Sequence, residues 1–108
     1  MIAPPEYQDL IGRPYRGCME LVFEMYSRMG FELSVDRDTP QGYFWQDLED
    51  WSELEPMDVV VLGREKHFSL YLGDDWLLHD THGGVGKVRF SSTAGKVTRI
   101  SRLKRCPL

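Results

Sequence analysis

The sequence predicts a single α+β domain, in which N-terminal helices pack on a small antiparallel β-sheet. The chain has 108 residues, of which 42% are hydrophobic and 28% charged, and this is the composition of one compact globular domain. Apolar residues before Pro56 recur with helical spacing, whereas those after it fall in short runs separated by glycine or polar turns. Helices followed by strands are typical of the α+β class.

The first predicted helix spans residues Cys18 to Met29. Before it, Gly12, Pro14 and Gly17 predict an irregular lead-in. Within it, the apolar residues fall at i, i+4, i+7, i+8 and i+11 and form one stripe of a helix: Cys18, Val22, Met25, Tyr26 and Met29. Cys18 therefore begins the face that we expect to be buried.

A short second helix is predicted after a loop that contains Asp36 and Pro40. Its apolar residues have the spacing i, i+1, i+4 and i+7, and they are Phe44, Trp45, Leu48 and Trp51. An aromatic stripe of this kind usually packs in a core, so we assign it no binding role.

Five strands are predicted after Pro56. They cover residues 57–62, 67–72, 75–81, 87–91 and 96–103, with glycine or polar turns between them. No internal repeat or linker divides the chain, and we expect one domain over residues 1–108.

Net charge and hydropathy argue against several kinds of partner. The net charge is −4, yet residues 87–108 hold seven basic side chains and no acidic one. Only Phe90 is an aromatic residue among these charges, so a base-stacking platform is lacking and we expect no nucleic acid partner.

No apolar run approaches the ~20 residues that span a bilayer. Residues 1–7 lack the basic start and apolar stretch of a signal peptide, and we therefore expect neither membrane insertion nor ordinary export.

Cys18 is the leading candidate for a nucleophile. It follows Gly17 and opens the first helix, while the three histidines, His67, His79 and His82, cluster later in the chain. A helix N-terminus and a neighbouring imidazolium both favour a thiolate. A thiolate, an imidazole and a third polar group that orients the imidazole are the requirements of a cysteine peptidase, and backbone amides at the helix start would form part of an oxyanion hole.

The turn between the second and third strands selects the orienting residue. If the loop is Gly73 to Asp75, His67 pairs with Thr81 and shares a face with His79. If the loop is only Asp74 and Asp75, His67 pairs with His82 instead. The sequence leaves both possibilities open.

These residues resemble the NlpC-type cell-wall cysteine peptidases, a papain-like bacterial family with a branch in phage tail assembly proteins. The similarity covers most of the chain and rests on Ile11 to Tyr15, on Cys18 with Leu21 and Val22, on Leu54 to Val59, on His67 to Gly73 and on Leu77 to His79.

The resemblance implies a papain-like NlpC-type fold with a catalytic set of Cys18, His67 and His79, and Tyr15 as a substrate contact. It also implies hydrolysis of peptidoglycan stem peptides at the D-γ-glutamyl–diamino acid bond, without a cofactor or metal. The expected partners are the stem peptide and phage tail proteins. The expected location is a phage virion, or the cytoplasm until delivery to the cell wall.

Three alternatives follow from the same residues. Gly17, Met19 and Glu20 stand where the family commonly has aspartate, serine and glycine, so an inactive structural or wall-binding module of a phage tail tip is the main alternative. A zinc site is a second, because thiolate and neutral imidazole suit that ion; its ligands would be Cys18, His67, His79 and His82, with Asp80 in reserve. A disulfide between Cys18 and Cys106 is the third.

Overall fold

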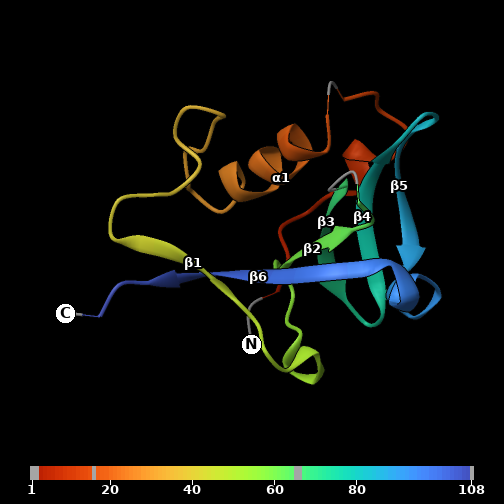
Figure 1. The fold of residues 1–108 in the computed structure, drawn as a ribbon. Coiled ribbons are helices and arrows are strands. Elements are labelled where there is room, and N and C mark those ends of the chain that lie inside the picture. The colour runs from red at the N-terminus through yellow and green to blue at the C-terminus, as the bar shows by residue number, and fades with distance from the viewer. Residues whose placement is uncertain (1–2, 16, 65–66, 108) are drawn as a thin grey trace.

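A six-stranded antiparallel sheet and one α-helix are the main elements of the residues that the structure describes (Figure 1). The computed structural model describes residues 3–15, 17–64 and 67–107. The sheet order is β1-β6-β2-β3-β4-β5, and every neighbouring pair is antiparallel. The elements are η1 (Gln8–Leu10), α1 (Cys18–Ser27), β1 (Tyr43–Asp47), η2 (Trp51–Glu53), β2 (Val59–Leu62), β3 (His67–Gly73), β4 (Trp76–Thr81), β5 (Gly84–Arg89), η3 (Phe90–Lys96) and β6 (Val97–Arg105), where η denotes a 3-10 helix.

The predicted fold class is wrong. We expected N-terminal helices on a small sheet, in the manner of the papain-like NlpC-type fold, but the described residues hold a single α-helix and the sheet dominates. The predicted second helix is strand β1 followed by the short turn η2. Aromatic residues favour a pleated surface, and β1 finds a long partner because Phe44 pairs with Lys104 and Trp45 with Leu103 of β6.

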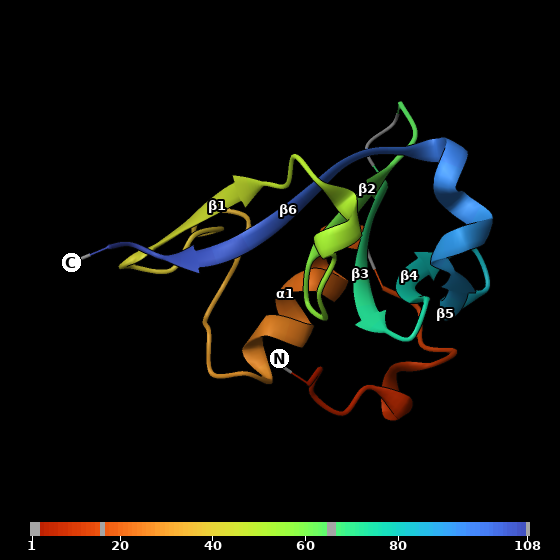
Figure 2. The same ribbon diagram turned by 90° about the horizontal axis from the view of Figure 1, so that it is seen from below.

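The β1–β6 pair forms an arm that leaves the body of the domain. In both ribbon views these two strands run together away from β3, β4 and β5, and the chain ends beside the far end of the arm (Figures 1 and 2). β6 also pairs with β2, so it connects the arm to the rest of the sheet. No helix in the described part of the chain has the length and apolar character needed to cross a bilayer.

Other predicted elements lie close to observed ones. The first helix begins at Cys18 as predicted and ends at Ser27, two residues earlier than Met29. The five predicted strands correspond to β2 through β6 with shifted ends. The largest shift is in β5, which begins at Gly84 rather than Lys87, because residues 84–89 pair along the whole of β4.

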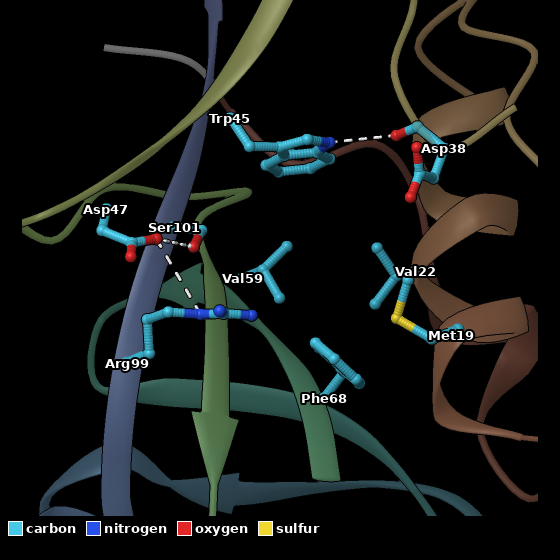
Figure 3. Close-up of a pocket in the computed structure, with 9 residues that line it drawn as sticks. All are labelled: Met19, Val22, Asp38, Trp45, Asp47, Val59, Phe68, Arg99 and Ser101. Atoms are coloured by element: carbon cyan, nitrogen blue, oxygen red, sulfur yellow. Dashed lines mark hydrogen bonds and ion pairs between the residues drawn. The ribbon is translucent and has the colours of Figure 1, made fainter. Parts of the chain in front are cut away.

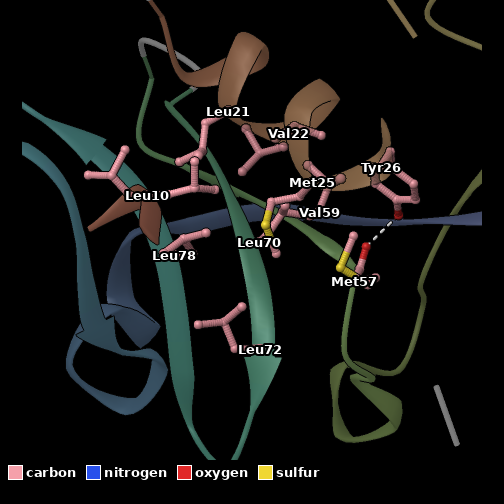
Figure 4. Packing of buried hydrophobic residues seen from close by; sticks show 12 residues of the cluster. Leu10, Leu21, Val22, Met25, Tyr26, Met57, Val59, Leu70, Leu72 and Leu78 are labelled. Atoms are coloured by element: carbon pink, nitrogen blue, oxygen red, sulfur yellow. Dashed lines mark hydrogen bonds between the residues drawn. The ribbon is translucent and has the colours of Figure 1, made fainter. Parts of the chain in front are cut away.

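α1 packs on one face of the sheet and forms the main core (Figure 4). Strand residues alternate between faces, so Leu70 and Leu78 meet α1, whereas Leu77 and Ile100 lie in a smaller cluster on the opposite face. The main cluster consists of Leu10, Leu21, Val22, Met25, Tyr26, Met57, Val59, Val61, Leu70, Leu72, Leu78 and Val85. The hydroxyl of Tyr26 donates to the backbone oxygen of Met57, and burial raises the pKa of this phenol, which therefore stays protonated.

Two backbone bonds attach the N-terminal lead-in to β5. The amide of Gly12 donates to the Val85 oxygen at 2.8 Å, and the amide of Val85 donates to the Arg13 oxygen at 2.9 Å. Gly84 makes this approach possible, because it has φ +104° and a Cβ there would lie 2.6 Å from the Gly12 oxygen. The contact therefore holds residues 12 and 13, which precede Cys18, beside the last residues of β4 and the first residues of β5.

Gly84→Ala is therefore expected to lower the free energy of unfolding by about 2 kcal/mol or more, since the alanine meets both an unfavourable φ and a backbone oxygen. Gly86→Ala on the same strand is the matched control, because a Cβ at Gly86 has nothing within 4 Å. Urea denaturation of both variants measures the difference. Equal stabilities would contradict the proposed close contact.

Candidate active site

An open cleft of about 950 Å³ brings together the residues singled out in the sequence. Cys18, His67 and His79 all line it, together with Tyr15. The start of α1 forms one wall, and the first residues of β3 and the last residues of β4 form another. The remaining lining residues are Pro14, Leu62, Gly63, Arg64, Asp80, Thr81, His82, Val88, Thr93 and Lys96.

His67 and His79 are in direct contact across the β3–β4 pair. Nε2 of His67 lies 3.3 Å from Nδ1 of His79, and the rings meet edge to face with centroids 5.5 Å apart. If Nδ1 of His79 accepts, His67 carries its proton on Nε2 and keeps Nδ1 available to a third group. This is the arrangement needed when one imidazole orients another.

The hairpin reaches this register in a way that combines both predicted turns. Asp74 and Asp75 form a two-residue turn with φ of 54° and 68°, and Gly73 pairs with Trp76. Leu72 is then bulged, and Tyr71 pairs with Leu77 beyond it. Because Leu72 is skipped, the residues beyond it pair as they would after the three-residue loop Gly73 to Asp75, and His67 and His79 share a face. His79 therefore meets His67, whereas His82 stays exposed after the end of β4.

The pKa of His79 lies below the usual value of 6.5. Burial is the main cause, and the positive charge that His67 can carry adds to it, while Asp80 acts in the opposite direction. His79 is therefore neutral at neutral pH and suited to accept a hydrogen bond from His67.

This lowered pKa predicts a dependence of stability on pH. Because the folded pKa is below the unfolded value, the unfolded chain binds more protons as the pH falls from about 6.5, and folding loses stability in that window. The free energy of unfolding of the wild type should fall more steeply than that of His79→Gln between about pH 8 and about pH 5. Denaturation curves at several pH values measure both slopes. Parallel slopes would show that burial of His79 has no such effect.

Cys18 lies at the first position of α1 and is partly exposed to the cleft. The first backbone amides of a helix have no partner within the helix, so they point toward the space in front of Cys18. In the described residues, no hydrogen bond links the sulfur to an imidazole. The thiol of Cys18 and the two imidazoles therefore line the same cleft, but the thiol is not hydrogen-bonded to either of them.

Two further residues considered in the sequence take different positions. Tyr15 is partly buried in the cleft wall, and burial, followed by the charge of Glu24, raises the pKa of its hydroxyl. Glu20 is exposed and lines a neighbouring hollow with Glu24 and Asp36, and it is not among the residues that line the cleft.

Sequence reasoning assigned three charged residues of the cleft no part in the peptidase site. Arg64 lies in the turn after β2 and Lys96 ends η3, and the two segments meet where the Gly63 amide donates to the Lys96 oxygen at 2.8 Å. Asp80 was considered only as a reserve zinc ligand, yet its Oδ1 is buried and has no hydrogen-bond partner among the described residues. No spacing in the sequence indicated these positions, because they depend on how distant strands pair.

The other two chemical alternatives receive no support from the geometry. Among the residues with described positions, no three histidine, cysteine, aspartate or glutamate side chains converge as a metal site requires. Cys18, which begins α1, and Cys106, which follows β6, are both free thiols, so they do not form the disulfide considered above.

Comparison with models of known protein families finds no match, and a search of curated proteins finds no significant relative.

Proposed function

We propose that this protein is a cysteine peptidase that hydrolyses peptidoglycan stem peptides. The observation that carries the proposal is that one open cleft is lined both by Cys18 and by the contacting pair His67 and His79. The peptidase chemistry follows from these side chains. The choice of the D-γ-glutamyl–diamino acid bond rests on the resemblance described from the sequence.

Each residue has a distinct role in the proposed reaction. His67 takes the thiol proton, and the sulfur of Cys18 attacks the carbonyl carbon to form a C–S bond. Amides at the start of α1 stabilise the oxyanion. His67 then gives its proton to the leaving nitrogen as the C–N bond breaks, and water hydrolyses the thioester to release the acid and restore the thiol. His79 keeps the ring of His67 in position.

The charged lining of the cleft is compatible with such a substrate. A stem peptide carries carboxylates and ammonium groups close together. Arg64 and Lys96 offer positive charges to the carboxylates, and Asp80, which also lines the cleft, offers a negative charge to an ammonium group.

Incubation with defined stem peptides and mass analysis of the products tests the proposal. The wild type should yield two fragments whose summed mass exceeds that of the substrate by one water. Cys18→Ala should yield none, whereas Cys106→Ala, which alters the other free thiol, should retain activity. Intact peptides after incubation with the folded wild type would refute the proposed activity.

A non-catalytic wall-binding module is the second candidate. It is favoured by the lack of a hydrogen bond between Cys18 and an imidazole in the described residues, although such bonds in free enzymes often form only when substrate is present. A binding module would retain stem peptides without cleaving them, and Cys18→Ala would bind them as tightly as the wild type.

A further inference from the structure

A second hollow lies between α1 and the β1–β6 arm, and we call it the arm pocket (Figure 3). It has a volume of about 260 Å³, and its apolar wall consists of Met19, Val22, Trp45, Val59 and Phe68. A cavity of roughly 150 Å³ holds benzene, so this pocket has room for a somewhat larger molecule.

The arm pocket is separate from the cleft. No lining residue is common to the two. Phe68 and His67 are neighbours on β3, and successive strand residues point to opposite faces of a sheet. A ligand in the arm pocket would therefore lie on the face of β3 opposite to His67, and its binding does not depend on the chemistry proposed for the cleft.

One wall of the arm pocket carries two opposite charges side by side. Nε of Arg99 lies 3.8 Å from Oδ1 of Asp47, and the same oxygen accepts from the hydroxyl of Ser101 at 2.6 Å. In Figure 3 the guanidinium of Arg99 extends over the apolar wall beside Val59. The side chain of Arg99 makes no hydrogen bond to any residue that the structure describes, although its Nε lies near Asp47. Most of its donors and Oδ2 of Asp47 are therefore available.

We propose that the arm pocket binds an apolar α-amino acid, with the carboxylate on Arg99, the ammonium group on Asp47 and the side chain against the apolar wall. An α-amino acid has its two charges adjacent, and Arg99 and Asp47 present the opposite charges adjacent in the same way. A planar guanidinium suits a carboxylate because it can donate two parallel hydrogen bonds.

A third charge sets an order of preference among ligands. Asp38 lies across the pocket from Arg99, on the side of α1, and its backbone oxygen accepts from Nε1 of Trp45 at 2.9 Å (Figure 3). With Asp38 and Asp47 against Arg99, the pocket has a net negative charge. It should therefore favour a zwitterion, tolerate an amine and reject a carboxylate that lacks the ammonium group.

Titration of the intact protein with L-leucine, isopentylamine and isocaproate tests this order. The indole N–H resonance of Trp45 in proton–nitrogen NMR spectra, assigned with Trp45→Phe, reports on the pocket wall. Leucine should bind saturably with a dissociation constant on the order of 1 mM, more tightly than isopentylamine, and isocaproate should bind least.

Two substitutions separate this site from general charge effects. Arg99→Gln should weaken leucine binding by about tenfold or more, because it removes the partner of the carboxylate. Arg105→Gln, on the same strand but in contact with Tyr43 outside the pocket, should bind as the wild type does. The proposal fails if leucine gives no saturable shift at about 10 mM, if isocaproate binds as well as leucine, or if both variants bind equally.

Discussion

His67→Ala is expected to abolish hydrolysis of stem peptides and to slow alkylation of Cys18 near neutral pH by at least about tenfold. His67 is the group that takes the thiol proton in the proposed reaction, and an imidazolium beside a sulfur favours the thiolate. Iodoacetamide labelling followed by mass analysis of the Cys18 peptide measures the rate. The exposed thiol of Cys106 in the same sample is an internal reference.

His82→Ala is the matched control for this variant. His82 lines the same cleft but is exposed, and among the described residues it makes no hydrogen bond with His67, so its loss should leave both rates close to those of the wild type. His79→Ala should lie between the two, because it removes the partner of His67 rather than the base itself. Equal labelling rates in wild type and His67→Ala would rule out a thiolate–imidazolium pair.

Asp58→Ala is expected to destabilise the protein by about 3 kcal/mol. Only 2% of the Asp58 side chain is exposed, and its carboxylate accepts from Nε and one terminal nitrogen of Arg102 at 2.9 and 2.8 Å. It also accepts from the backbone amide of Glu55 at 2.8 Å. Alanine would remove two acceptors of a mostly buried guanidinium, which keeps its bond to the Glu53 backbone oxygen, and the acceptor of the Glu55 amide.

Asp9→Ala is the comparison for this effect. Asp9 also holds an arginine through two short bonds, at 2.6 and 2.8 Å from Arg28, but it is exposed, so water replaces the lost contacts. Chemical denaturation should show a clearly larger loss for Asp58→Ala than for Asp9→Ala. Similar losses would mean that burial of the Asp58–Arg102 pair adds nothing to its contribution.

The basic residues at the end of the chain illustrate how a charge pattern resolves in a fold. Arg102 is held by Asp58, and Arg105 donates to the hydroxyl of Tyr43 at 3.1 Å. Arg89 lies 3.6 Å from the centroid of the Trp76 ring. Residues that look like one basic segment in the sequence are therefore distributed over separate contacts on β5 and β6.

The sequence alone determined the features that depend on neighbours in the chain. The helix from Cys18 follows from a stripe of apolar residues one turn apart, and the strands after Pro56 follow from short apolar runs between turns. The grouping of a thiol at a helix start with several histidines was also visible, because the types of the residues themselves carry that chemistry.

Only the tertiary structure decided the features that depend on distant partners. Phe44 and Trp45 belong to a set of apolar residues with helical spacing, yet β6 pairs with them and makes them part of a strand. The bulge at Leu72 brings His79 rather than His82 to His67. The arm pocket and its Arg99–Asp47 pair exist because β1, β6 and α1 enclose one space. Pairing between strands far apart in the chain outweighs local preference, and no window of sequence contains that information.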